Sequence, residues 1–232
     1  PAGQYIHYER CIIHDNGEDA FQDSSGRINN LILDMCWLFN SRFKPNSTVI
    51  FNAERHPDGI QLYGGHMSGV KIGRSVLGPY LLQACALGDQ ASAVDQLAVE
   101  DTLVYGNYGH NFADNNGQIA PVGWSLKNVT SDMGVGASGG QVDISHANGQ
   151  IAATDCIFTG GGYWNSGPGT YSGNFVYGLP GSGGPPRTAD PQYAAQVYGS
   201  KAQAADYMLA AQSVAQGKGV RSFTSIAKLL AA

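Results

Sequence analysis

A short apolar phrase recurs along the chain and constrains the fold more than any other feature. It consists of an apolar residue, a second one two positions later, and a small or apolar residue three positions after that. Alternation with a period of two predicts a strand with one buried face, and a longer repeat predicts one superhelical coil per copy. Its copies begin at a nearly regular spacing, at Ile6, Leu31, Val70, Leu97, Trp124 and Ile151. The phrase therefore predicts an all-β fold, a single-stranded right-handed parallel β-helix of about six coils.

Cysteine occupies the last position of the phrase in three copies, at Cys11, Cys36 and Cys156. In a stack of coils, equivalent residues lie about 4.8 Å apart, so we expect these cysteines to belong to an interior ladder. The fourth cysteine, Cys85, also stands in an apolar segment, and the sequence contains no CxxC pair. This pattern favours free, buried thiols over two disulfides and argues against a zinc site.

The interval from Leu31 to Val70 is longer than the others and predicts an insertion between two coils, which we place at residues 40–52. Insertions in repeat folds cluster on one face, and that face commonly binds ligands. A stretch rich in Pro and Gly begins after Tyr177. We therefore divide the chain into a β-helix at residues 1–178, a linker at 179–190 and a helical segment at 191–232. No capping sequence precedes the first coil, which favours a fragment of a longer chain.

The C-terminal segment carries the signals of a helix. Asp190 and Pro191 suit the N-cap and the first helical position, and residues 192–216 are rich in Ala, Gln, Met and Leu before Gly217. We expect one helix over that range and a short one over residues 223–230. This segment either caps the open end of the β-helix or serves oligomerisation or attachment.

Charge and hydropathy exclude several kinds of partner. Charged residues make up 13% of the chain, the formal net charge is -5, and no run of Lys or Arg occurs. A protein without a basic patch cannot displace counterions from nucleic-acid phosphates or bind an anionic membrane surface strongly. No apolar stretch approaches the roughly 18 residues of a membrane-spanning helix. We therefore predict no nucleic-acid partner and no membrane insertion, and neutral or amphiphilic partners fit better.

Two copies of a D-x-x-Q element begin at Asp19 and at Asp58, and they are separated by the same interval as the phrases at Leu31 and Val70. We therefore expect them to stack in neighbouring coils. Carboxylates about 5 Å apart raise each other's proton affinity or bind a cation. A nearby histidine or lysine can abstract a proton while an arginine stabilises an enolate. We therefore predict Asp19, His56 and Asp58 as catalytic residues. The predicted substrate-binding residues are Glu54, Arg55, Gln61, Lys71, Arg74 and Tyr80.

A structural interpretation of the same residues stays open, because Asp and Gln at turns cap strand ends and stacked glutamines form amide ladders. We predict no cofactor, with Ca²⁺ between the carboxylates as the alternative. The scattered histidines His7, His66, His110 and His146 are expected at the surface or in turns. Six aromatic residues in Gly-rich turns are expected to be partly exposed and suit sugar stacking or a subunit interface: Tyr105, Tyr108, Tyr163, Trp164, Tyr171 and Tyr177.

The segment His56-Pro57-Asp58-Gly59-Ile60-Gln61 resembles an H-x-D-x-(I/L)-Q element of bacterial and phage β-helix proteins. With the coil pattern, it makes the chain similar to the pectate-lyase-like superfamily of parallel β-helix proteins. The N-T-D and G-H-G motifs of polygalacturonases and the D-P-H motif of mannuronan epimerases are absent. In its free cysteines and its modular C-terminal segment, the chain resembles phage tailspikes, which assemble in a reducing cytosol.

The resemblance implies a tailspike-like virion protein that binds a bacterial surface polysaccharide. Such a protein either only binds the polysaccharide or also cleaves it, as a polysaccharide lyase or glycoside hydrolase. It also implies a homotrimer or contacts with other virion proteins, and a location in the virion. One alternative is a secreted, extracellular polysaccharide lyase that acts on uronic-acid polymers. The other is a non-catalytic structural or decoration protein of a virion.

Overall fold

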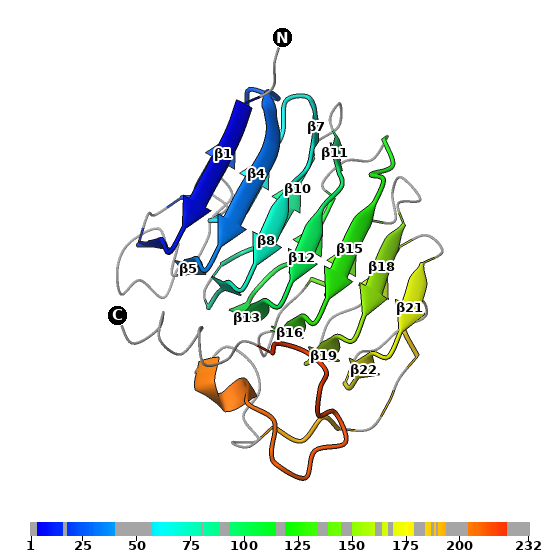
Figure 1. Ribbon diagram of the computed structural model, residues 1–232. Helices are drawn as coiled ribbons and strands as arrows, with labels where there is room; N and C mark the ends of the chain where they lie inside the picture. The colour runs from blue at the N-terminus through cyan, green and yellow to red at the C-terminus, as the bar shows by residue number, and fades with distance from the viewer. Residues whose placement is uncertain are drawn as a thin grey trace.

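The structure is a computed structural model that describes residues 4–15, 18–39, 57–79, 81–88, 93–114, 119–133, 139–144, 150–160, 164–166, 169–178, 184–186, 188, 190–193 and 204–221. These residues form a parallel β-solenoid, in which the chain passes through three sheets in each coil (Figure 1). Every strand pair among them is parallel. The predicted all-β parallel fold is confirmed, and a right-handed sense is the one expected of parallel crossovers.

Each sheet takes one strand from successive coils. Sheet A contains β1 (Gln4–Glu9), β4 (Ile28–Asp34), β8 (Lys71–Gly73), β12 (Ala98–Glu100), β15 (Trp124–Lys127), β18 (Ile151–Thr154) and β21 (Thr170–Ser172), and β4 also joins it to β7 (His66–Ser68) and β11 (Ala93–Asp95). Sheet B contains β2 (Ile12–His14), β5 (Trp37–Phe39), β9 (Val76–Leu77), β13 (Leu103–Asn107), β16 (Thr130–Met133), β19 (Ile157–Thr159) and β22 (Phe175–Val176). Sheet C contains β3 (Phe21–Asp23), β6 (Ile60–Leu62), β10 (Cys85–Leu87), β14 (Phe112–Ala113), β17 (Val142–Asp143) and β20 (Trp164–Asn165).

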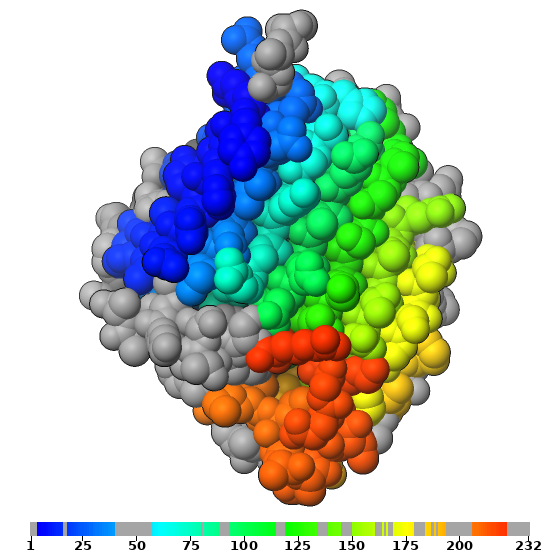
Figure 2. All heavy atoms as spheres, viewed as in Figure 1, coloured from blue at the N-terminus to red at the C-terminus, as the bar shows by residue number. Residues whose placement is uncertain are grey.

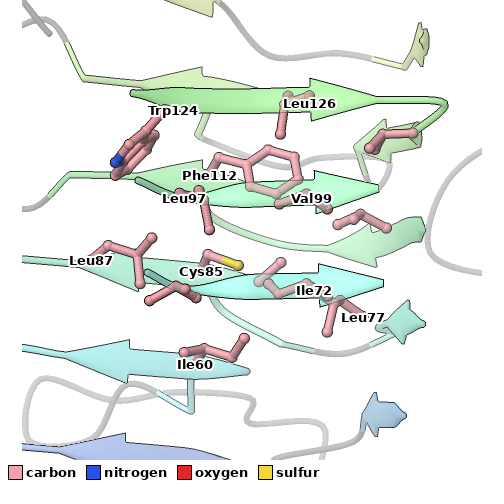
Figure 3. Packing of buried hydrophobic residues seen from close by; sticks show 14 of the residues in the cluster. Ile60, Ile72, Leu77, Cys85, Leu87, Leu97, Val99, Phe112, Trp124 and Leu126 are labelled. Atoms are coloured by element: carbon pink, nitrogen blue, oxygen red, sulfur yellow. The ribbon is translucent and has the colours of Figure 1, made fainter. Parts of the chain in front are cut away.

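The recurring phrase supplies sheet A and one wall of the core. Its two apolar positions are buried in every coil after the first, as at Leu31 and Leu33, and they meet the apolar residues of sheets B and C inside the solenoid (Figure 3). In the first coil the same positions, Ile6 and Tyr8, are only half-buried, because β1 is covered by β4 on one side alone. Stacking of coils is therefore what buries the phrase.

In each coil, a short bend, which we call the arc, turns the chain from sheet A into sheet B. One residue of the arc adopts a left-handed backbone conformation, which is uncommon for residues other than glycine. The residue after it points inward. Cys36 and Ser75 hold this position in two successive coils, and the Cys36 backbone N–H donates to Ser75 Oγ at 3.0 Å. All four cysteines are free, and Cys36, Cys85 and Cys156 are buried as expected, while Cys11 is half-buried. The left-handed residues have φ between 48° and 57° and are Arg10, Met35, Arg74, Asp101, Asn128 and Asp155.

The described part of the C-terminal segment packs against the outer face of sheet B rather than over an end of the solenoid. Tyr193, Tyr207 and Val220 belong to one apolar cluster with Val76 and Leu103 of that face. Figure 2 shows the segment, in orange and red, lying against the coils. The helix expected over residues 192–216 is wrong for residues 204–216, which form a 3₁₀ helix at Ala204–Tyr207 followed by turns, while residues 194–203 lie outside the described residues.

The non-helical path of this segment has a tertiary cause. The Tyr207 hydroxyl donates to Asp132 Oδ2 at 2.6 Å, and the Val220 backbone N–H donates to Thr130 Oγ1 at 3.1 Å. Lys218 forms an ion pair with Asp155 on the neighbouring arc. Thr130 and Asp132 are both on β16, and Asp155 is on the arc of the next coil. A straight α-helix would separate Tyr207 from Val220 by about 20 Å, so meeting partners this close together requires a chain that turns back on itself.

Candidate functional site

Asp19 and Asp58 occupy equivalent positions just before strands β3 and β6 of sheet C. Asp19 Oδ1 accepts a hydrogen bond from the Asp58 backbone N–H at 2.8 Å, and Asp58 Oδ1 accepts one from the Gln83 backbone N–H at 3.0 Å. Each carboxyl group therefore caps the backbone of the following coil. The predicted stacking of the two D-x-x-Q elements is confirmed.

The glutamines of the two elements form the second row of this ladder. Gln22 and Gln61 are paired in register, and Gln22 Nε2 donates to Gln61 Oε1 at 2.8 Å. The same nitrogen donates to Asp19 Oδ2 at 2.9 Å, and Gln61 Nε2 donates to Asp58 Oδ2 at 3.4 Å. The four side chains form one network, which we call the carboxyl–amide ladder.

Exposure divides the carboxyl–amide ladder into an inner and an outer part. Asp58 is 0% exposed, whereas Asp19 is half-buried and Gln22 is exposed. Burial, reinforced by the nearby charge of Asp19, raises the pKa of Asp58 to about 8, although the bond from Gln83 opposes the shift. A carboxyl group with no exposed surface cannot touch a substrate. The geometry therefore favours capping for Asp58 and leaves Asp19 and Gln22 as the groups that can meet a ligand.

The carboxyl oxygens of this ladder face N–H donors rather than an empty cation site. Both oxygens of Asp19 and both oxygens of Asp58 accept hydrogen bonds from backbone or amide nitrogens. Calcium prefers six to eight oxygen ligands, which this arrangement does not offer. Within the described ranges, no group of three or more His, Cys, Asp or Glu side chains could hold a metal ion.

A row of aromatic rings lies on the outer face of sheet B in the first two coils. His14 stacks on Phe39 with ring centroids 5.0 Å apart, and Phe39 stacks on Trp37 at 4.0 Å. His14 is exposed, and Trp37 and Phe39 are half-buried. Trp37 Nε1 donates to the Gly78 carbonyl oxygen at 2.9 Å, which fixes the indole. We call these three residues the aromatic ladder.

The two ladders border the same corner, where sheet B passes into sheet C in the first two coils. In the first coil, β2 ends at His14 and the chain soon reaches Asp19. In the second, β5 ends at Phe39 and the chain returns to sheet C at Asp58. The residues between them, 40–56, contain the predicted insertion and lie outside the described residues.

The structure separates other predicted site residues from this corner. Lys71 is on the outer face of β8, and Arg74 is on the following arc, where it forms an ion pair with Asp34. Both belong to the sheet A side of the solenoid, whereas Gln61 is on sheet C, so the structure does not bring Lys71 and Arg74 together with the D-x-x-Q elements. The other predicted residues lie outside the described residues: Glu54, Arg55, His56 and Tyr80.

Most of the aromatic residues predicted to stack on sugars do not line an open surface. Tyr105 and Trp164 are 3% and 4% exposed, because Tyr105 lies beneath Tyr207 and Trp164 packs on Phe158. Tyr108 and Tyr171 are half-buried, Tyr177 is exposed, and Tyr163 lies outside the described residues. Of the scattered histidines, His7 and His66 are exposed, His110 is half-buried, and His146 is outside the described residues.

The sequence carried a signal for the aromatic ladder that composition alone does not reveal. Trp37 and Phe39 flank the buried Leu38, and His14 is two positions after the outward-facing Ile12. Period-two alternation continued past the arc would have placed these rings outside. Their stacking further requires the register between β2 and β5, in which Ile12 pairs with Trp37 and His14 with Phe39.

Comparison with known proteins gives no match to a family model, to a curated protein or to a solved structure. Fold and site geometry therefore define the class of the molecule, which is a parallel β-solenoid protein. No helix of the described residues is long and apolar enough to cross a membrane.

Proposed function

We propose that the protein binds a polysaccharide at the corner between sheets B and C of its first two coils. The observation that carries the proposal is that the aromatic ladder on sheet B and the carboxyl–amide ladder on sheet C belong to the same two coils and flank the same corner. The half-exposed rings of Trp37 and Phe39 offer apolar surface to sugar rings, and Asp19 and Gln22 offer polar atoms to sugar hydroxyl groups. A glycan that lies across the corner can use both.

The site is held in place before a ligand arrives, which favours binding. The indole of Trp37 is fixed by Gly78, and its ring is stacked on Phe39. Both oxygens of Asp19 are fixed by hydrogen bonds from the next coil and from Gln22. Side chains that are already ordered lose little conformational entropy when a ligand binds.

We extend the proposal to a tailspike-like protein of a virion that recognises a bacterial surface polysaccharide, as a homotrimer or together with other virion proteins. A β-solenoid followed by a C-terminal segment of different structure supports this, as do the free thiols, which suit assembly in a reducing cytosol. The alternative that involves no glycan binding is a non-catalytic structural or decoration protein of a virion.

A secreted polysaccharide lyase is the second candidate, and one observation favours it. Asp58 has a pKa of about 8 because of burial and the neighbouring Asp19, so the pair holds a proton near neutral pH. Strongly shifted pKa values concentrate at catalytic sites. The full burial of Asp58 weighs against direct contact with substrate, so binding without cleavage stays the first proposal.

The test incubates the protein with a panel of bacterial surface polysaccharides and uronic-acid polymers. Calorimetry records binding, ultraviolet absorbance records unsaturated lyase products, and an end-group assay records hydrolysis. We expect binding that is about tenfold weaker in Phe39→Ala and Asp19→Asn, because each removes one contact to the sugar. Thr170→Ala, at an exposed position of sheet A, is the matched control and should bind as the wild type does.

Each other result has a defined meaning. Absorbance that disappears in Asp58→Asn supports the lyase, and new reducing ends alone support a hydrolase. Binding that is unchanged in Phe39→Ala and Asp19→Asn places the site elsewhere. If no glycan of the panel binds, the structural alternative replaces the proposal.

A further inference from the structure

Two thiols occupy equivalent positions in the first two coils, on the arc between sheets A and B. Glu9 pairs in register with Asp34 before the arc, and Ile12 pairs with Trp37 after it. Cys11 and Cys36 therefore stack on each other. The Trp37 backbone N–H donates to the Cys11 carbonyl oxygen at 2.8 Å, which places the two arcs in direct contact.

The two side chains also point the same way, into the solenoid. Cys11 Sγ donates to the Glu9 carbonyl oxygen and Cys36 Sγ to the Asp34 carbonyl oxygen, each at 3.5 Å. Cys36 Sγ lies equally close to the carbonyl oxygen of Tyr8 in the first coil. The Cys36 thiol thus already reaches toward the coil that carries Cys11.

We propose that Cys11 and Cys36 form a reversible disulfide that ties the first coil to the second. Stacked residues lie about 4.8 Å apart, inside the range of about 4.4 to 6.8 Å between the α-carbons of a disulfide. The β-carbons of a disulfide are only about 3.8 Å apart, so the bond must draw the two arcs together. The first coil can follow, because β1, β2 and β3 each pair on one side only among the described residues.

The oxidant is a small-molecule disulfide of the glutathione class. The thiolate of Cys11, which is half-buried, attacks one sulfur of the oxidant, forms a mixed disulfide and releases one small thiol. The thiolate of Cys36 then attacks the Cys11 sulfur and releases the second small thiol. Two protein thiols are oxidised and one small-molecule disulfide is reduced, so electrons and protons balance.

The environment makes the bond slow to form and easy to reduce. Burial is the main cause that raises the pKa of Cys36 to about 11, so little of its thiolate is present near neutral pH and the second step is slow. A bond that pulls two arcs together stores strain, and strained disulfides are more readily reduced. The pair therefore suits a reversible lock on the coil that carries half of the proposed glycan site.

The fold supplies its own controls. Cys156 holds the same arc position in a later coil, but its stacked neighbours are Val129 and Asn174. Cys85 is on sheet C, away from the arcs. Neither has a thiol in the equivalent position of an adjacent coil. Serine at the ladder position is natural to this solenoid, as at Ser75, so Cys11→Ser and Cys36→Ser are expected to fold.

The test exposes the folded protein to oxidised glutathione, blocks free thiols after denaturation and measures the intact mass. We expect the wild type and the variants Cys85→Ser and Cys156→Ser to lose two alkylation sites, and peptide mapping to join Cys11 to Cys36. Cys11→Ser and Cys36→Ser should keep every remaining thiol free of intramolecular cross-links. The oxidised wild type should unfold about 5 °C higher than the reduced form, and the shift should vanish after mild reduction.

Three results overturn the proposal. The first is a wild type that keeps all four thiols after prolonged oxidation while circular dichroism shows it folded. The second is a cross-link that involves Cys85 or Cys156. The third is a link between two molecules through Cys11, which non-reducing electrophoresis would reveal as a dimer.

Discussion

The first two coils and the later coils build the corner between sheets B and C from different chemistry. In the first two coils, carboxyl groups cap the strands of sheet C, and one of them, Asp58, is buried. In the later coils, the corner is filled by amide and hydroxyl groups that are 0% exposed. Asn111 Nδ2 donates to Ser131 Oγ at 2.8 Å and to Gln141 Oε1 at 3.1 Å.

In the later coils, a neutral network closes the inside of this corner, and His110 stands in the register position of Asp58. His110 Nδ1 accepts a hydrogen bond from the Gly140 backbone N–H at 3.1 Å. Gln141 uses both ends of its amide, because Oε1 accepts from Ser131 Oγ and Nε2 donates to the Thr159 carbonyl oxygen at 2.7 Å. A buried neutral network with every partner present is stable and uncharged. The fold thus uses a side-chain cap at this position in both regions, and the first two coils differ in using carboxyl groups for it, where aromatic rings remain half-exposed. This difference teaches that the first two coils are specialised.

The outer face of sheet B divides in the same way. From Val76 onward it is covered by residues of the C-terminal segment, which include Tyr207 and Val220. The aromatic ladder of the first two coils keeps part of its surface exposed. Trp37 packs against this covered cluster, so the cover reaches the ladder, and the exposed part of the ladder is the part that we propose a ligand contacts.

The largest effect is expected from breaking the neutral corner. Gln141→Leu removes the acceptor of the Ser131 hydroxyl, one of the two acceptors of Asn111 Nδ2, and the donor to the Thr159 carbonyl oxygen. Buried polar groups without partners are costly. We expect the free energy of unfolding to fall by about 3 kcal/mol. Urea denaturation followed by circular dichroism measures it. Glycan binding per folded molecule should not change, and a loss of binding would mean that the two corners are coupled.

The second-largest effect is expected on the part of sheet B that the C-terminal segment covers. Tyr207→Phe removes the hydroxyl that donates to the buried Asp132, which keeps a hydrogen bond from Thr159 Oγ1. We expect a loss of about 2 kcal/mol, because hydrogen bonds to charged groups contribute more than neutral ones. Thermal denaturation gives the shift. If the variant is as stable as the wild type, the C-terminal segment does not hold to sheet B through this bond.

The contrast between the covered and the open part of the outer face of sheet B also shows what could be predicted from the sequence. The phrase that forms sheet A is local, and its apolar positions repeat at a nearly constant interval, so the solenoid follows from it. The stacking of Asp19 on Asp58 follows from their shared offset. The path of the C-terminal segment depends instead on Asp132, which is far from Tyr207 in the sequence. An Ala-rich composition favours a helix there, and this distant contact overrides it.

The misplacement of Lys71 has a geometric cause. Each coil of the solenoid visits three sheets before the chain returns to the first. Lys71 follows Gln61 within the same coil, and by then the chain has already passed from sheet C to sheet A. Closeness in sequence does not mean closeness in space in this fold, whereas equality of position within the repeat does. The aromatic ladder obeys the second rule, since Ile12 and His14 stand opposite Trp37 and Phe39.

The buried acid itself provides a pH test. The folded pKa of Asp58 is raised from 3.8 to about 8 by burial and by Asp19, so the folded state retains a proton that the unfolded chain releases above about pH 4. Stability contributed by this group is then lost as the pH rises from about 4 to about 8, with a slope of at most about 1.4 kcal/mol per pH unit. In Asp58→Asn that slope should disappear, because an amide does not titrate.

Urea denaturation at several pH values in this window measures the slope for both proteins. Among the described residues, Asp19 and the buried thiol of Cys85 interact electrostatically with Asp58. Asp19→Asn should therefore reduce the slope without abolishing it. Equal slopes in the wild type and in Asp58→Asn would show that Asp58 is ionised in the folded state and that the first corner holds a buried charge, which the neutral network of the later coils lacks.

The smallest effect is expected at the arc on sheet A. Arg74 Nε donates to Asp34 Oδ1 at 2.9 Å, and its side chain is 49% exposed, so solvent and salt screen the pair. Arg74→Gln should change the free energy of unfolding by less than about 0.5 kcal/mol, as is usual for exposed ion pairs. It should also leave glycan binding unchanged, because this arc is on the sheet A side of the solenoid. A glycan that binds less tightly to Arg74→Gln than to the wild type would instead extend the site around the solenoid and join the two faces that the structure separates.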